Sequence, residues 1–255
     1  MRGCQVGSLE RIDQEQGTLG RHAGLLARVD YRLVESQADR EAIFRLRYRA
    51  YLKEGMVGPD PHGQVFDRYD DLPNSWIIAV YLDGALTSSL RITVASPDQP
   101  ECPSMAVFAD LLRPLLARGM VIVDPTRFVA DPDAVRIPEL PYLTLRLANL
   151  ACEHFGAQIG LASVRAEHQA FYRRVFMTAM AAPRHYPGLM KPIGLMGIDF
   201  PALRERIYGR YPFLRSTAAE RQRVFTRAAQ RHAPLLQPVL PSEPHAPVAS
   251  TMLRG

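Results

Sequence analysis

Two apolar runs that flank a two-residue turn constrain the fold of this chain more than any other part of its sequence. The runs are WIIAVYL and ALTSSLRITVA, and Asp83-Gly84 joins them. An Asp-Gly pair between such runs predicts a β-hairpin, because both positions tolerate the positive φ angles that the tight turn requires. The chain therefore contains a sheet with at least one antiparallel pair of strands.

Helix-type and strand-type spacings of apolar residues alternate around this hairpin. A capping signal at Ser36 begins a helix that Gly55 ends, and residues 56–74 form a long loop. Pro125 predicts a bulge or bend in its strand. The order β-α-β-β-α-β-α-β-α-β-α indicates a mixed α/β domain. The remaining patterns predict strands at 31–35, 120–130, 158–164 and 191–200, and helices at 105–118, 139–155, 166–180 and 201–211.

Composition divides the chain into three parts. We expect a flexible leader over 1–29, the working domain over 30–214, and a segment over 215–255 with one helix and a disordered tail rich in Pro and Ala. The chain has no window of 18 apolar residues and no apolar signal-peptide core, which argues against a membrane span and export. Three widely spaced cysteines form no CxxC pair and no evident metal cluster. We therefore expect a cytoplasmic protein.

The net charge of +5 favours acidic partners. Nucleic acid, anionic lipid and an acidic carrier protein all qualify, and charge alone does not choose among them. No aromatic-basic RNA motif or clear helix-turn-helix is present, which argues against nucleic acid. One group of arginines late in the domain forms either a patch that steers an acidic carrier helix or an ordinary solvated face. Its members are Arg165, Arg173, Arg174 and Arg184.

Several charged residues fall on predicted core elements. Arg47 lies on the first helix, and Asp67 and Asp70 lie in the loop beside it, so they form either a structural ion cluster or a clamp over the entrance to a substrate site. Arg91 falls on a central strand, where an unpaired charge is costly. Both Arg91 and Arg127 either pair with aspartates or hold a substrate carboxylate by two hydrogen bonds.

Asp124 is the candidate general base. An amine that is protonated near neutral pH must lose a proton before it attacks a carbonyl, and a buried carboxylate has a raised pKa suited to accept it. The alternatives are an aspartate that stabilises the bulge and one that pairs with Arg91.

Methionines gather late in the chain, with four of nine between positions 177 and 196. Methionine is flexible and lines adaptable apolar pockets. Met177 and Met180 therefore either bind an acyl tail or belong to the ordinary core.

Four short motifs follow one another along the chain. They are Arg47-x-x-x-Tyr51, Phe66-Asp67-x-Tyr69-Asp70, Ser89-Leu-Arg91 and Asp124-x-x-Arg127, and a segment FYRR follows them. This order resembles that of the long-chain N-acyl amino acid synthases, GNAT-like relatives of the acyl-homoserine-lactone synthases. The resemblance covers roughly residues 30–212. It implies the GNAT acyltransferase fold, with a mixed central sheet that is splayed in the middle and flanked by helices.

The resemblance also implies roles for individual residues. In GNAT enzymes a tyrosine on the helix after the fifth main strand commonly protonates the leaving thiolate, and Tyr172 stands at that position. A thiol with a pKa of about 8.5 leaves more readily beside a proton donor. The alternative for Tyr172 is a half-buried ring used for packing. By the same resemblance, a backbone N–H between Phe128 and Ala130 stabilises the oxyanion of the reaction.

The implied reaction moves a long-chain acyl group from the thioester of acyl carrier protein to the amine of an amino acid such as tyrosine. The usual GNAT cradle for coenzyme A contains glycine, but no glycine occurs from Met120 to Phe155. A loop without glycine cannot easily bring its backbone against a diphosphate. The expected co-substrate is therefore acyl-phosphopantetheine on the carrier protein, with no tightly bound cofactor and no metal.

Two other functions remain open. An acyl-homoserine-lactone synthase would use S-adenosylmethionine as the acceptor. The lactone synthases usually have a tryptophan soon after the first arginine motif and glutamate in place of Asp124, and this chain has neither. The other function is that of a catalytically silent protein that binds a carrier or nucleic acid on the same fold.

Overall fold

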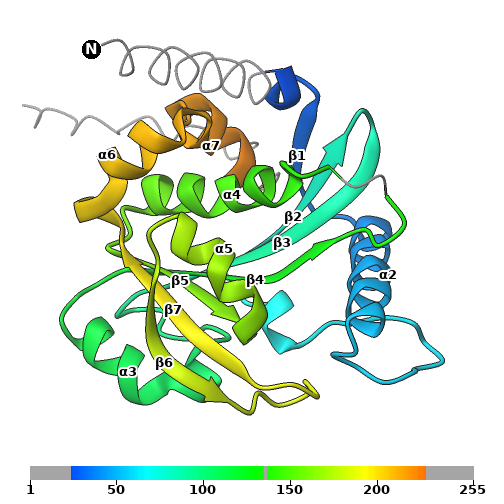
Figure 1. Cartoon of the computed structure of the whole chain (residues 1–255), viewed down its shortest axis with the longest axis horizontal. Helices are drawn as coiled ribbons and strands as arrows, with labels where there is room; N and C mark the ends of the chain where they lie inside the picture. The colour runs from blue at the N-terminus through cyan, green and yellow to red at the C-terminus, as the bar shows by residue number, and fades with distance from the viewer. Residues whose placement is uncertain (1–23, 135–136, 228–255) are drawn as a thin grey trace, which may run out of the picture.

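A mixed sheet runs through the middle of the structure, a computed structural model that describes residues 24–134 and 137–227 (Figure 1). The strands in these ranges are β1 (Val29–Leu33), β2 (Ser75–Leu82), β3 (Ala85–Ala95), β4 (Ile122–Ala130), β5 (Ile159–Val164), β6 (Thr178–Arg184) and β7 (Ile193–Asp199). The helices are α2 (Gln37–Lys53), α3 (Met105–Ala117), α4 (Leu140–Phe155), α5 (Gln169–Arg174), α6 (Phe200–Arg210) and α7 (Ala218–Phe225). Most of the expected leader and the tail after residue 227 lie outside the described residues.

The sheet has the strand order β1-β2-β3-β4-β5-β7-β6, and helices cover both of its faces. One face packs against α4, α6 and α7, and the other against α2 and α3 (Figure 1). Side chains alternate accordingly, with Val123 in the core beneath α4 and Ile122 in the core beneath α3. This arrangement confirms the predicted mixed α/β architecture. Within the described ranges, no helix has the length and apolar character needed to cross a membrane.

The local signals in the first half of the chain are confirmed. Asp83 and Gly84 have φ angles of 51° and 80° and turn β2 into β3. The Ser36 hydroxyl accepts a hydrogen bond from the N–H of Asp39 at 3.1 Å and so caps α2. The turn therefore joins β2 to β3, and the cap sets the first residue of α2.

The sheet is splayed in its middle, as the resemblance implied. The parallel strands β4 and β5 pair only at Ile122 with Ile159 and at Val123 with Gly160. Pro125 follows two residues later and has no backbone N–H to offer either neighbouring strand. Beyond Val123, β4 continues along β3 while β5 continues along β7, so a wedge opens between them.

The helix predicted over 166–180 is wrong in its second half. Only a 3₁₀ turn at Ala166–His168 and the short helix α5 are helical, and Phe176 has a φ of 68°. The chain then reverses into β6, which pairs antiparallel with β7. A short apolar run does not distinguish helix from strand by spacing alone, and here pairing with a later strand decides the conformation.

The C-terminal helix α7 belongs to the same core as the rest of the fold. Val224 and Phe225 are buried, and the indole Nε1 of Trp76 donates a hydrogen bond to the carbonyl of Phe225 at 2.9 Å. Arg146 inside α4 forms an ion pair with Glu220 of α7. The helix expected after residue 214 is therefore present, and it packs against the same core as the working domain.

A buried ion cluster fastens the loop after α2 to the sheet. Asp67 forms ion pairs with Arg91 of β3 and Arg127 of β4, each at 2.5 Å. Asp70 pairs with Arg47 of α2 at 2.9 Å and with Arg91 at 3.0 Å. The two aspartates also form a reciprocal capping box at the N-terminus of the 3₁₀ helix η1 (Arg68–Asp70). Arg47, Asp67 and Asp70 thus belong to one ion cluster, with Arg91 and Arg127 as further members.

The charges in this cluster depend on one another. Burial alone would raise the pKa of Asp67, but the guanidinium groups of Arg91 and Arg127 outweigh it and lower that pKa to about 2. Burial lowers the pKa of Arg47 to about 10, so Arg47 still carries its charge near neutral pH. The removal of one member would leave buried charges without their partners, which commonly costs about 3–5 kcal/mol.

We predict that Asp67→Asn destabilises the fold near neutral pH and has a smaller effect in acid. In the folded protein the pKa of Asp67 lies below its ordinary value of 3.8. The ionised carboxylate therefore stabilises the fold above about pH 4, and this stabilisation is lost as the pH falls to about 2. A shift of this size corresponds to about 2 kcal/mol. Urea unfolding of the parent and the variant across this pH range measures the difference.

The control is Asp83→Asn, which removes an exposed partner of Arg28. It should change the free energy of unfolding much less than Asp67→Asn does, at any pH. If the loss in Asp67→Asn did not depend on pH, the ion pairs of Asp67 would not be its source.

Candidate active site

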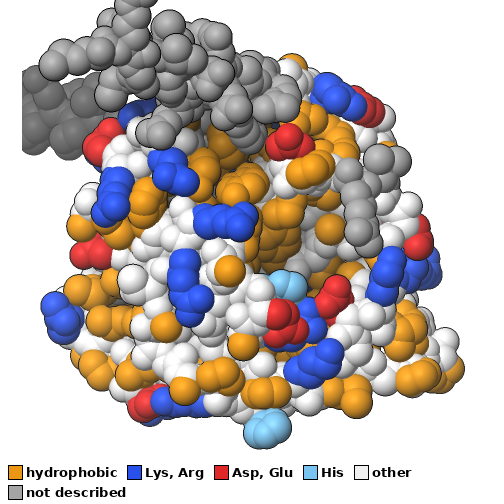
Figure 2. Space-filling view, in the orientation of Figure 1, with side chains coloured by type: hydrophobic (Ala, Val, Ile, Leu, Met, Phe, Trp, Pro, Cys, Tyr) orange, Lys and Arg blue, Asp and Glu red, His pale blue; other side chains and the backbone are white. Residues whose placement is uncertain are grey.

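A cavity of about 730 Å³ lies where β4 and β5 diverge. Its walls come from the end of α2, from β4 after Pro125, from the start of α4, from α5, and from the loop that precedes β7. Figure 2 shows this face hollowed, with hydrophobic side chains inside and charged ones along the rim. The volume suits a small-molecule or acyl-chain site, which commonly measures about 300–1,000 Å³.

A bulge in β4 forms one edge of the cavity. Arg91 pairs with Thr126 and Ser89 with Val129, so Arg127 and Phe128 are both set against a single residue of β3. Arg127 takes a φ of 54°, a left-handed conformation that is uncommon outside glycine. The predicted bulge is therefore present, but it lies two residues after Pro125, because Pro125 itself still pairs with β3.

The bulge brings predicted substrate-binding residues to the cavity. Phe128 and Ala130 both line it. Their role in stabilising an oxyanion through a backbone N–H stays a prediction. The geometry that such a role needs is a backbone N–H free of the regular ladder, and a bulge provides one.

Asp124 is fully buried on the face of β4 beneath α3. Its two carboxylate oxygens accept hydrogen bonds from the backbone N–H and the hydroxyl of Ser104, both at 2.8 Å. Burial raises the pKa of Asp124, and the bonds from Ser104 and the charge of Arg91 oppose that rise only in part. The side chain lies behind the cavity wall, whereas Ser104 lines the cavity. The alternative ion pair with Arg91 is not formed, since Arg91 pairs with Asp67 and Asp70.

Tyr172 of α5 lines the cavity and is 9% exposed. Burial raises the pKa of its phenol, and the neighbouring phenol of Tyr51 adds to the effect. Tyr172 is therefore protonated near neutral pH, the state that a proton donor requires. Tyr51 also lines the cavity, with its ring centroid 5.3 Å from the guanidinium carbon of Arg127.

Arg91 and Arg127 line the cavity while they hold Asp67. Of the two roles left open by the sequence, ion pairing is the one formed here. Arg91 also donates from Nε to the hydroxyl of Thr126 at 3.0 Å. Of the cluster's members, only these two arginines line the cavity, and neither aspartate does.

The arginines of the expected carrier patch do not lie together. Arg165 is buried at the cavity wall, pairs with Glu54 and Glu167, and lies 2.6 Å from the Nε2 atom of His168. It is therefore no part of an exposed patch, which corrects the expectation from sequence. Arg184 pairs with Asp110 of α3. Arg173 and Arg174 are exposed on α5, beside the cavity.

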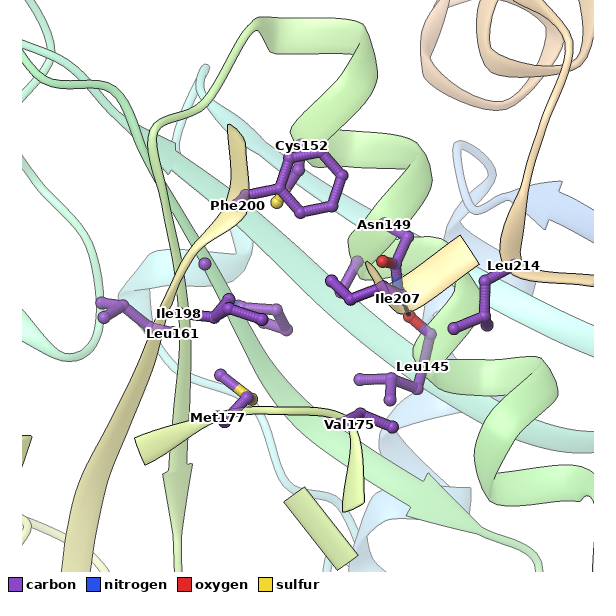
Figure 3. A pocket seen from close by; sticks show the side chains of 13 residues that line it. Leu145, Asn149, Cys152, Leu161, Val175, Met177, Ile198, Phe200, Ile207 and Leu214 are labelled. Atoms are coloured by element: carbon purple, nitrogen blue, oxygen red, sulfur yellow. Dashed lines mark hydrogen bonds between the residues drawn. The ribbon is translucent and has the colours of Figure 1, made fainter. Parts of the chain in front are cut away.

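The expectation that Met177 and Met180 line an acyl pocket is wrong for the large cavity. Met177 lines a separate cavity of about 40 Å³, with Cys152, Phe200 and Ile207 among its neighbours (Figure 3). Met180 lies on β6 and packs against Gly197 and the core beneath α3. The sequence predicts a helix at both residues, but that helix ends before Met177 and β6 follows it. Their side chains therefore do not face the large cavity.

The sequence analysis missed several residues of the site. Ser163 of β5 and Tyr186 of the loop before β7 line the cavity together with Ser104. A serine immediately before a helix usually indicates an N-cap, but Ser104 forms no such bond and binds Asp124 instead. No spacing in the sequence links these residues, because the sheet alone brings them together. Among the described residues, no group of three His, Cys, Asp or Glu side chains could hold a metal ion.

Comparison with known proteins identifies the fold. The structure of FeeM, an N-acyl amino acid synthase from uncultured soil microbes, matches with a TM-score of 0.60 at 16% identity, covering 70% of this chain and 94% of that one. The acyl-homoserine-lactone synthase LasI matches with a TM-score of 0.50 at 15% identity, covering 66% and 88%. These matches confirm the acyltransferase fold. No curated protein is similar enough in sequence to match.

The family comparison goes beyond the fold. The family described as N-acyl amino acid synthase FeeM matches residues 42–199, more than half of the chain. The matched segment contains the ion cluster, the bulge and Tyr172. This chain therefore belongs to the FeeM family of N-acyl amino acid synthases.

Proposed function

We propose that this N-acyltransferase moves a long-chain fatty acyl group from the thioester of acyl carrier protein to the amine of an amino acid, in the cytoplasm. The observation that carries the proposal is the wedge between β4 and β5, which opens into a cavity edged by a bulge and by a protonated tyrosine. A thioester placed in this wedge would have its carbonyl near the bulge and its sulfur within reach of a proton donor.

The residues divide the chemistry between them. The neutral amine attacks the thioester carbon, a C–N bond forms, and the C–S bond breaks. Tyr172 gives its proton to the departing thiolate and recovers one from the amide nitrogen as the intermediate collapses. A backbone N–H at Phe128 to Ala130 stabilises the oxyanion meanwhile. Asp124, whose pKa burial raises, takes the proton that the ammonium form of the acceptor must lose.

The acceptor is inferred from the charge of the cavity wall. Arg91 and Arg127 lie in the wall, whereas their partners Asp67 and Asp70 do not line the cavity. A carboxylate on the acceptor would be stabilised there by charge-assisted hydrogen bonds. This supports an amino acid as the acceptor, and tyrosine remains the favoured one from the family resemblance.

The donor is inferred from the loop between β4 and α4. It contains no glycine, which disfavours a backbone cradle for the diphosphate of coenzyme A. The exposed Arg173 and Arg174 lie on α5, whose residues Phe171 and Tyr172 line the cavity. An acidic carrier protein could dock there and deliver its acyl-phosphopantetheine.

The direct test is an assay of the purified protein with matched acyl-carrier-protein and acyl-coenzyme A donors and a set of amino acids. Mass spectrometry should detect long-chain N-acyl amino acids, formed faster from the carrier protein. Equal rates with both donors would contradict the assigned donor. An acylated lactone formed from S-adenosylmethionine, or the absence of any acylated amine, would contradict the function.

Tyr172→Phe should lower kcat by about 100-fold and leave the fold intact, because the variant keeps the ring but loses the proton donor. Tyr208→Phe is the matched control, since Tyr208 is equally buried but bonds to Glu153 away from the cavity. Steady-state kinetics and thermal unfolding of both variants provide the comparison. An unchanged kcat in Tyr172→Phe would remove Tyr172 from the mechanism.

Asp124→Asn should lower the rate most at low pH, where little of the acceptor amine is free of its proton. Above the pKa of the acceptor amine, the deficit should shrink, because the solvent then supplies the neutral amine. The measurement is the pH profile of kcat/KM for the acceptor. A profile parallel to that of the parent would show that Asp124 accepts no proton from the amine.

A further inference from the structure

Two serine hydroxyls connect the buried carboxylate of Asp124 to the cavity. The Ser104 hydroxyl donates to Oδ1 of Asp124 at 2.8 Å, and its Oγ lies 2.7 Å from the Oγ of Ser163. The three residues come from the turn before α3, from β4 and from β5. Ser104 and Ser163 line the cavity, and Asp124 does not. The chain of hydrogen bonds therefore leads from the cavity into the protein interior.

The direction of these hydrogen bonds follows when Asp124 is ionised. A hydroxyl has one hydrogen to donate. The hydrogen of Ser104 goes to Asp124, so the hydrogen of Ser163 must go to Ser104. The lone pairs of Ser163 are then available to a donor in the cavity. A protonated or neutral amine is such a donor. Each hydrogen bond in the chain is then donated in the direction of the Asp124 carboxylate.

The splay of the sheet exposes Ser163, the end of the hydrogen-bond chain that faces the cavity. Asp124 and Ser104 are fully buried, whereas Ser163 is only partly so. β5 pairs with β4 up to Gly160, and Ser163 lies three residues beyond that point, where the wedge is open. The same opening that admits a substrate thus uncovers the Ser163 hydroxyl.

We propose that Ser163 and Ser104 relay a proton from the acceptor amine to Asp124, a step that rests on the proposed acylation of an amine. The ammonium group gives one proton to Oγ of Ser163 while Ser163 gives its own to Oγ of Ser104. Ser104 gives its proton to Oδ1 of Asp124. The amine becomes neutral, Asp124 becomes a neutral acid, and both serines end as hydroxyls. The proton later returns to solvent by the same route.

None of the ionisable side chains named below changes its charge in the relay, so only Asp124 does. The guanidinium of Arg91 on β3 favours the ionised carboxylate. Burial raises the pKa of the Cys102 thiol well above its usual value, and burial also raises that of the Tyr186 phenol. Both groups therefore keep their protons near neutral pH. The carboxylate of Asp124 is therefore the group at the end of this hydrogen-bond chain that can accept the proton.

The test compares Ser163→Thr with Ser163→Val, which have the same shape and differ only in the hydroxyl. With the relay, kcat/KM for the amino acid is nearly flat with pH between the pKa of Asp124 and that of the amine. Without it, only the free amine reacts. The Val variant should then lose activity about tenfold per pH unit below the pKa of the acceptor amine, while the Thr variant follows the parent.

Controls separate the relay from the fold and from the function. Ser75→Ala removes a buried hydroxyl that bonds to Thr93 within the sheet, and it should keep the profile of the parent. Thermal unfolding shows whether each variant is folded. Identical pH profiles for the Thr and Val variants of an active enzyme would overturn the relay alone. A parent that acylates no amine would overturn the proposed function, and the relay with it.

Discussion

The early end of the β4–β5 ladder is the constraint on which the rest of the site depends. After two residue pairs the strands separate, and each keeps its other neighbour. A strand edge inside a sheet normally exposes unpaired backbone groups. Here Pro125 and the bulge at Arg127 and Phe128 occupy that edge on β4, and a cavity replaces the missing pairing.

The buried charges make this opening stable. Arg127 sits in a left-handed conformation that costs free energy, and its ion pair with Asp67 holds it there. Asp67 in turn belongs to a loop that Asp70 and Arg47 fasten to α2. The helix, the loop and the two strands are therefore held by one connected set of charges, and the shape of the cavity wall follows from it.

The sequence predicted those parts of the fold that local rules decide. The hairpin at Asp83, the cap at Ser36 and the cluster around Asp67 each depend on residues with strong conformational or charge preferences. The sequence could not predict β6, because Met180 lies on an element whose conformation depends on pairing with β7. For the same reason the sequence could not predict the hydrogen-bond chain from Ser163 to Asp124, because its three residues come from segments that meet only in the folded protein. Family resemblance supplied the position of Tyr172, which no spacing alone would single out.

The anchoring of α7 turns the single tryptophan into a local reporter. Trp76 contacts the rings of Phe155 and Phe225, with the first centroid at 4.7 Å and the second at 6.3 Å, while its indole N–H is bound to the carbonyl of Phe225. Indole emission responds to the polarity and hydrogen bonding of its surroundings. The fluorescence of this protein therefore senses whether its last described helix is docked, from a location outside the residues that line the large cavity.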